Sequence, residues 1–239
     1  MTGLHLGPTP RGRAATARRR GPWCLLAITL ALIVTTAGPV EASGGRGATI
    51  PPYTATVSAV TRATVPYSWR RGCPVGPNQL RLIRLRYYGF DDRSHVGRII
   101  VNASVVDSVI AVFGRLYARR FPIRRMVPVD AYHGHDPASM AADNTSSFNC
   151  RRAVAPGPPQ WSVHAYGEAI DVNPVENPYV DAGVVMPAAG ARYLDRADVR
   201  PGMAVPGGTL VEAFAAVGWY WGGRWTGSPD YQHFSSTGG

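Results

Sequence analysis

The chain has 239 residues, of which 45% are hydrophobic and 17% are charged. Its 25 basic residues, all of them arginine, outnumber its 15 acidic residues, so the formal net charge is +10. The excess is spread along the chain and lacks the alternation of aromatic and basic residues typical of nucleic-acid-binding segments, which argues against nucleic acid as a partner.

The N-terminal segment has the layout of a secretory signal peptide. A basic start that includes Arg18–Arg20 precedes an apolar run over residues 24–37, and small or apolar residues follow at Val40 and Ala42. The apolar run has 14 residues, whereas a transmembrane helix needs roughly 20. We therefore predict a signal peptide over residues 1–42 and a protein that is secreted or held in the cell envelope. A retained membrane anchor is the alternative.

Removal of residues 1–42 changes both the charge and the cysteine count. It leaves 20 basic and 14 acidic residues, a net charge of +6. Such a charge suits an anionic surface such as a bacterial cell wall, although charge that serves only solubility explains it equally well. Of the three cysteines, Cys73 and Cys150 remain. In an exported protein this pair predicts a disulfide; two buried free thiols are the alternative.

Residues 43–78 are rich in Gly, Pro, Thr and Ser, and we predict an extended lead-in or linker there. A single domain is predicted over residues 79–239. Its expected strands are Leu80–Tyr88, Val96–Val101, Met126–Val129, Phe148–Arg152, Ala169–Asn173 and His233–Ser235.

Two helices and one long loop complete the expected elements. Apolar residues recur at helical spacing after Asn102, which predicts a helix that this residue caps and that ends near Arg120. A second helix is expected over Leu210–Val217, with Gly218 as its C-terminal stop. Residues 131–146 are expected to form a polar loop. Short strands with separate helices indicate an α+β fold with a small antiparallel sheet flanked by helices.

Four polar residues in the C-terminal half suggest a metal site. His164 and Asp171 lie on either side of Gly167, a residue that permits a tight reversal of the chain. His233 follows near the C-terminus, with Asp230 three residues before it. Two imidazoles and one carboxylate form a ligand set that catalytic zinc uses, and a further carboxylate can take a proton from water. From the residues alone, a zinc site and a group of structural polar residues remain alternatives.

Two motifs resemble those of the zinc D-alanyl-D-alanine peptidases: they read SVHAYGEAID (162–171) and DYQHF (230–234). That family includes vancomycin-resistance carboxypeptidases and phage endolysins, and its fold is shared with lysostaphin-type enzymes and the hedgehog signalling domain. The resemblance covers about residues 79–239. It implies that His164, Asp171 and His233 bind Zn²⁺ and that Asp230 is the general base. Many carboxypeptidases of the family have glutamate at this last position, so the aspartate leaves open which bond is cleaved.

The resemblance also implies an arginine upstream of the first motif that faces the metal. Arg151 is the best candidate, since its guanidinium can hold a substrate carbonyl oxygen or carboxylate. The adjacent Arg152, or a surface role for Arg151, is the alternative. Three further residues are candidates for substrate binding: Ser162 in the first motif, Asn144 in the polar loop, and Trp225, which either lines the cleft or belongs to the core.

A rival site consists of His133 and His135, whose spacing places both side chains on one face of a strand. No distant third ligand is evident, and solvated loop histidines are the favoured interpretation. The sequence thus predicts a monomeric, exported zinc peptidase that acts on peptidoglycan stem peptides, a D-alanyl-D-alanine-type carboxypeptidase. The alternatives are an L-alanyl-D-glutamate endopeptidase and a catalytically silent cell-wall binding module.

Overall fold

The computed structural model describes residues 50–154 and 158–238. The predicted signal peptide, residues 1–42, lies outside these residues. All described residues belong to one compact unit, Gly47–Gly239. None of the helices in the described ranges combines the length and the apolar character needed to cross a bilayer.

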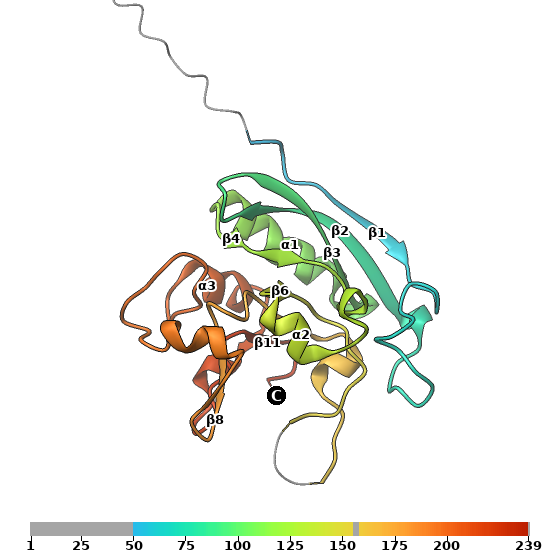
Figure 1. The fold of residues 1–239 in the computed structure, drawn as a ribbon. Helices are drawn as coiled ribbons and strands as arrows, with labels where there is room; N and C mark the ends of the chain where they lie inside the picture. Colours follow the sequence, from blue (N-terminus) through green and yellow to red (C-terminus); the bar gives the residue numbers. More distant parts are fainter. Residues whose placement is uncertain (1–49, 155–157, 239) are drawn as a thin grey trace, which may run out of the picture. The chain divides into compact units, whose positions relative to one another are not determined.

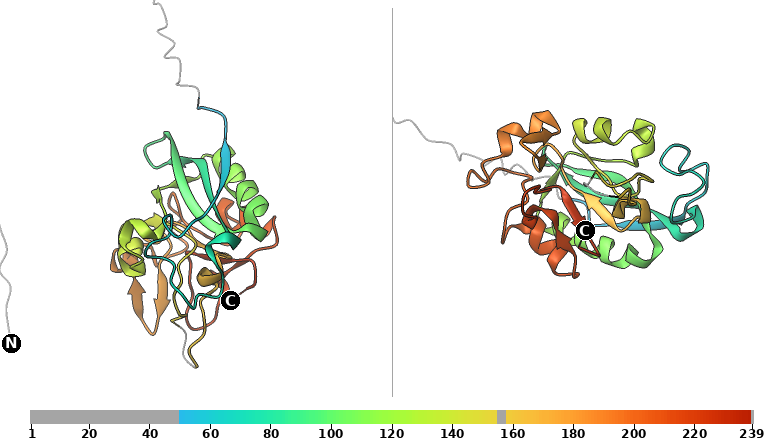
Figure 2. Two further views of the ribbon diagram at one scale, coloured as in Figure 1. Left: turned by 90° about the vertical axis from the view of Figure 1, so that its right-hand side faces the viewer. Right: turned by 90° about the horizontal axis from the view of Figure 1, so that it is seen from below.

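The main sheet is built on a long central strand, β2 (Leu80–Gly89). One edge of β2 pairs antiparallel with β3 (Ser94–Asn102). Along the other edge, β1 (Ala55–Ala59) pairs antiparallel and β4 (Pro122–Ile123) adds a short parallel pairing. Helix α1 (Val106–Ala118) lies along one face of this sheet (Figures 1 and 2). The strands over Leu80–Tyr88 and Val96–Val101 and the helix after Asn102 are therefore confirmed.

The main core fills the space between this sheet and α1. Alternate residues of a strand point to the same face, and the inward set meets the apolar stripe of the helix. The buried side chains at this contact are Ile83, Leu85, Ile99, Val101, Val109, Phe113 and Leu116. Each fully buried side chain of this kind stabilises the fold by about 1.5–3 kcal/mol relative to an exposed one.

A second, smaller antiparallel sheet has the order β10–β11–β7. Its strands are β7 (Ala169–Asp171), β10 (Tyr220–Trp221) and β11 (His233–Ser235). The ring of Phe234 in β11 stacks on the ring of Phe214 in α3 (Thr209–Ala215), with the ring centroids 4.1 Å apart. Both rings belong to the main core, so the small sheet and α3 pack against it. The strands near Ala169 and His233 and the second helix were all predicted.

The remaining elements are short, and some were not predicted. They are the parallel pair β5 (Arg125–Met126) and β6 (Asn144–Thr145), helix α2 (Asp136–Ala141), the hairpin β8 (Tyr179–Asp181) and β9 (Val184–Met186), and six 3₁₀ turns. The mixture of helices and small sheets agrees with the α+β prediction. The prediction named only an antiparallel sheet. The structure adds two short parallel pairings, β4 with β2 and β5 with β6.

Three predicted elements differ from the structure. The polar loop over residues 131–146 contains α2, because the His135 side chain accepts a hydrogen bond from the backbone of Ala138 and caps the helix. Phe148–Arg152 forms no strand. Its backbone N–H groups bond in turn to separate partners, Phe148 to Ile100 and Cys150 to Ser68, so no continuous ladder develops. The strand expected over Met126–Val129 is limited to β5, because Val129 already begins a 3₁₀ turn.

The segment expected as a lead-in or linker, residues 43–78, is packed where it is described. Strand β1 extends the main sheet, and Val60, Val65 and Val75 are buried in a second apolar cluster with Phe148. Composition alone predicted an extended segment outside the domain. The pairing of β1 with β2 and the burial of three valines hold the segment against the domain. The predicted disulfide between Cys73 and Cys150 is confirmed, with a Cα–Cα distance of 5.9 Å, and it ties this segment to the chain just before Arg151.

Candidate metal site

His164 is positioned by a short capped turn. Ser162 begins the 3₁₀ turn Val163–Tyr166, and its hydroxyl accepts a hydrogen bond from the backbone N–H of His164 at 3.3 Å. Gly167 ends the turn in the left-handed region, with φ of 74°. A Cβ atom there would lie 2.7 Å from the backbone nitrogen of Asn102, so only glycine fits. The tight reversal expected at Gly167 is therefore observed.

Strand pairing brings the second motif to the first. In the antiparallel register of β7 and β11, Asp171 lies directly opposite His233. Residues directly opposite in such a pair have Cβ atoms about 4.5–5.5 Å apart, so both side chains share one face of the small sheet. Gly222 also contributes, because a Cβ atom at this position would approach the Cβ atoms of both Asp230 and His233 to 3.2 Å.

His164, Asp171 and His233 form a buried cluster that could hold a metal ion, with potential ligand atoms all within 4.8 Å of one another. His164 Nε2 lies 3.3 Å from Asp171 Oδ2 and 3.2 Å from His233 Nδ1, and His233 Nδ1 lies 3.3 Å from Asp171 Oδ1. Burial by itself raises the pKa of Asp171, but His164 and then His233 reverse this and hold the pKa well below its usual range. The carboxylate is therefore in the form that binds a cation.

The orientation of His164 follows from its second ring nitrogen. Nδ1 lies 2.8 Å from the carbonyl oxygen of Ser147, which can only accept a hydrogen bond, so Nδ1 bears the proton. The lone pair of Nε2 is then directed at the cluster. Such a bond to the outer nitrogen is the usual way in which proteins orient a histidine ligand.

Asp230 lies beside the cluster, and its Oδ1 is buried without a hydrogen-bond partner. Burial, and then the negative charge of Asp171, raise the pKa of Asp230 to about 7, while His233 and Arg151 act in the opposite direction. A buried carboxyl oxygen that lacks a partner is costly to the fold. Such an unpartnered oxygen is typical of a residue with a catalytic role.

Of the two adjacent arginines, Arg151 is the one on the side of the cluster, since its charge acts on Asp230. Its Nε lies 2.9 Å from Asp136 Oδ2 at the start of α2, and Asn149 donates a hydrogen bond to the other oxygen of that carboxylate. Arg152 points elsewhere: its guanidinium lies 3.9 Å from the ring centroid of Trp161. Asp136 was not singled out from the sequence, because nothing in the loop pattern distinguishes it from its polar neighbours.

The three residues predicted to bind substrate have different surroundings. The Trp225 ring lies 5.2 Å from the His233 ring, at one side of the cluster. Ser162 is occupied in capping the His164 turn. Asn144 is fully buried, and its side chain bonds to both backbone groups of Val127 and to Ser139. Three of the four hydrogen bonds that an asparagine side chain can form are thus made inside the fold, and contact of Asn144 with substrate stays a prediction.

The rival histidine pair is engaged in other contacts. His135 caps α2, and the His133 ring packs edge-on against Tyr67 at 4.7 Å. In the ranges that the structure describes, the metal-type cluster found is His164, Asp171 and His233. His133 and His135 thus each have contacts of their own in the fold, and His135 belongs to the start of a helix and not to a loop.

Two asparagines that sequence reasoning missed hold the chain after Asp171. Asn173, with φ of 46°, donates a hydrogen bond to Pro122 and accepts one from the backbone of Arg124. Asn177 donates to Val172 and Gly202. Each asparagine precedes a proline, and such Asn-Pro pairs are a turn signal that could have marked both positions.

A buried carboxyl pair lies in the same region. Glu176 is 1% exposed, and Arg124 lies 3.5 Å from it and 3.4 Å from Asp143. Burial, and then contact with Asp143, raise the pKa of Glu176 to about 8. Glu176 is therefore protonated in the folded protein at neutral pH but ionised in the unfolded chain.

This raised pKa predicts a loss of stability at alkaline pH. The contribution of Glu176 is fully present below its unfolded value of 4.5 and is lost as the pH rises through about 8. Glu176→Gln keeps a neutral side chain, so the difference in unfolding free energy between variant and parent should grow with pH, by at most about 1.4 kcal/mol per pH unit. Urea unfolding between pH 5 and 9 measures it, with exposed Glu212→Gln as the control. Parallel curves for parent and Glu176→Gln would show that Glu176 is ionised in the fold.

Residues 156–236 match a protein-family model described as D-alanyl-D-alanine carboxypeptidase. The matched segment contains both motifs, and hence all three residues of the cluster and Asp230. The match supports the resemblance found from the motifs over this segment of the chain. Searches of curated proteins and of solved structures gave no match to the chain.

Proposed function

We propose that this chain is an exported zinc metallopeptidase that hydrolyses peptide bonds in peptidoglycan stem peptides, as a D-alanyl-D-alanine-type carboxypeptidase. The proposal rests on one observation. A buried His164–Asp171–His233 cluster lies beside a buried, unpartnered carboxyl oxygen of Asp230. The family match over residues 156–236 supports the substrate class.

The donor set and its spacing support zinc. Two imidazoles and one carboxylate, with a fourth position free for water, are typical of catalytic zinc. Zinc bonds of about 2.0–2.1 Å in tetrahedral geometry place neighbouring ligand atoms roughly 3.3–3.4 Å apart. The two histidine nitrogens lie 3.2 Å apart, and each lies 3.3 Å from a different oxygen of Asp171. One ligand atom from each residue lies within 4.8 Å of the other two, which supports a cluster that holds the ion.

The chemistry divides between the ion and the protein. When bound, zinc acidifies water and polarises the substrate carbonyl group. Asp230 accepts the proton of the attacking water and then donates it to the departing amine. Its buried Oδ1 atom has no hydrogen-bond partner, which supports a role for that oxygen in this transfer.

Arg151 is proposed to bind the negative charge of the substrate. A carboxypeptidase must recognise a terminal carboxylate, and a guanidinium does so with paired, charge-assisted hydrogen bonds. Arg151 Nε lies 2.9 Å from Asp136 Oδ2, and the charge of Arg151 lowers the pKa of Asp230 beside the cluster. The ion pair thus acts to orient Arg151.

The other features of the chain are consistent with this proposal. A signal peptide over residues 1–42, cleaved after Ala42, would export the protein as a monomer with a net charge of +6. That charge suits an anionic cell wall. We also propose a hedgehog/D-Ala-D-Ala peptidase-like fold, which the antiparallel β10–β11–β7 sheet and its site support.

Digestion of purified peptidoglycan with the zinc-loaded protein tests this function. Mass spectrometry of the soluble fragments should show stem peptides that have lost a terminal D-alanine, and free D-alanine should accumulate. The chelated protein is the control, and it should release nothing. Whole peptides freed from the glycan would instead identify an endopeptidase that cleaves between L-alanine and D-glutamate. Absence of any product from zinc-loaded protein would favour a silent binding module.

A further inference from the structure

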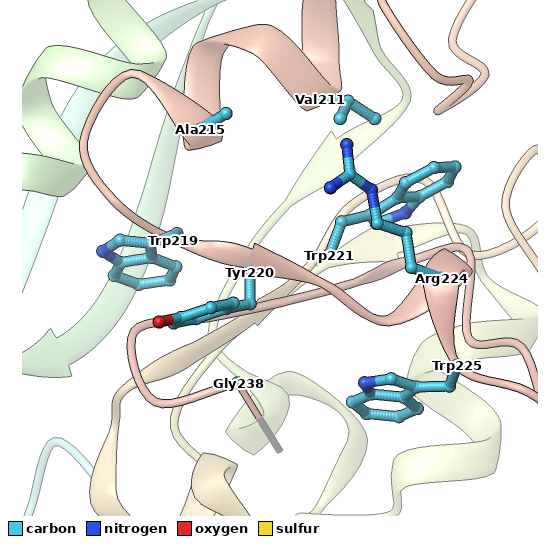
Figure 3. A pocket seen from close by; sticks show the side chains of 8 residues that line it. All are labelled: Val211, Ala215, Trp219, Tyr220, Trp221, Arg224, Trp225 and Gly238. Atoms are coloured by element: carbon cyan, nitrogen blue, oxygen red, sulfur yellow. The ribbon is translucent and has the colours of Figure 1, made fainter.

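An aromatic groove of about 250 Å³ lies between α3 and the turn that follows β10. Figure 3 shows this groove from close by. Its walls include Val211 of α3 and a set of large side chains from residues 219–225, namely Trp219, Tyr220, Trp221, Arg224 and Trp225. None of these residues has a role in the chemistry proposed above apart from Trp225, which was considered as a cleft wall.

The groove adjoins the surroundings of the metal cluster at Trp225. This ring lines the groove and also lies 5.2 Å from the ring of His233. Tyr220 and Trp221 form β10, which pairs with β11, the strand of His233. Trp225 therefore places the groove next to the surroundings of the cluster.

The chemistry of the walls defines the occupant. Most of the surface is apolar, and Tyr220 is 60% exposed, an unusual exposure for a large aromatic side chain. Arg224 extends from its turn toward α3 (Figure 3). It is exposed, and in the part of the chain that the structure describes it forms no ion pair. An apolar trough with one uncompensated guanidinium suits an aliphatic chain that ends in a carboxylate.

We propose that this groove binds a carboxylate-bearing aliphatic side chain of the stem peptide, and that Arg224 selects for the carboxylate. The inference rests on the proposed function, because the stem supplies the ligand. Stem peptides contain a diamino acid that either keeps such a carboxylate, as meso-diaminopimelate, or lacks it, as lysine. The groove predicts preference for the diaminopimelate form. Arg224 is here a specificity residue, and it does not touch the bond that is cleaved.

Two synthetic stem peptides that differ only in diaminopimelate or lysine at that position test the proposal. With zinc-loaded parent protein, kcat/KM should be about 10-fold higher for the diaminopimelate peptide, the value of one charge-assisted hydrogen bond. Arg224→Gln should remove this difference, mainly through a higher KM, and should leave the lysine peptide unchanged. Arg98→Gln, an exposed arginine of β3, is the matched control. Equal cleavage of both peptides by the parent, or an equal loss for both in Arg224→Gln, would overturn the proposal.

A binding measurement separates this inference from the proposed function. Trp219, Trp221 and Trp225 line the groove, so their fluorescence should change when a peptide enters it. The zinc-loaded Asp230→Asn variant is titrated with each peptide. The diaminopimelate peptide should bind this variant more tightly than the lysine peptide, and the difference should disappear in the double variant that also carries Arg224→Gln. This result supports the groove even if the parent cleaves neither peptide. Identical affinities for the two peptides would contradict it even if the parent cleaves both.

Discussion

His164→Ala should lose most of the zinc that co-purifies with the parent protein, and with it all measurable peptidase activity. The substitution leaves one imidazole and one carboxylate, too few ligands for a catalytic zinc site. His164 also has the best-defined orientation of the three, because its Nδ1 bonds to the carbonyl of Ser147. Plasma mass spectrometry of the purified proteins gives the zinc content per chain, which should be close to a single ion for the parent.

Two matched variants make the result specific. His135→Ala and His95→Ala each remove a histidine that the structure places outside the cluster, His135 at the cap of α2 and His95 in an exposed pair with Asp91. Both variants should keep full zinc. Full occupancy in His164→Ala would contradict the assignment, and loss of zinc in His135→Ala would move the site to the loop at residues 133–135. Circular dichroism checks that each variant is folded.

Asp230→Asn should retain zinc and lower the turnover of a stem peptide by about 10²-fold or more, which is the usual contribution of a positioned acid–base group. The amide is almost the same size as the carboxyl group but cannot accept the proton of the attacking water. Single-turnover measurements of D-alanine release, made beside a zinc determination on the same sample, give both quantities. Asp107→Asn, at an exposed position on α1, is the control.

The stability of the metal-free protein gives an independent check. The pKa of Asp230 is raised, first by burial, so its contribution to stability is present below the usual pKa and is lost as the pH rises through about 7. Metal-free Asp230→Asn should therefore be at least as stable as the parent near pH 8.

Two outcomes would contradict the role proposed for Asp230. Loss of zinc in Asp230→Asn would make Asp230 a metal ligand, and unchanged turnover would place the general base elsewhere.

Several features could be predicted from the sequence because their signals are local. The apolar spacing of α1, the Asn102 cap before it and the long β2 strand each depend on residues a few positions apart. The tight reversal at Gly167 belongs to this class, whereas the capping role of Ser162 was found only in the structure. The disulfide was predictable for a different reason, because removal of the predicted signal peptide would leave only one pair of cysteines to join.

Other features depended on contacts between distant segments. Whether Asn144 faces a ligand or the interior was decided by its bonds to Val127 and Ser139, and its sequence neighbours do not show this. The position of Arg151 likewise depends on distant segments. The backbone before it donates hydrogen bonds to Ile100 and Ser68, and its side chain forms an ion pair with Asp136. A strand prediction from short apolar runs cannot foresee that successive N–H groups will find separate partners.

The candidate metal site combines both kinds of information. The sequence by itself determined which side chains have metal-binding chemistry, and the turn at Gly167 determined that His164 and Asp171 can approach each other. Only the tertiary structure placed His233 opposite Asp171, through the register of β7 and β11, and left Oδ1 of Asp230 buried without a hydrogen-bond partner. The physical reason is range: caps, turns and periodicity act over a few bonds, whereas strand register and desolvation depend on how the whole chain packs.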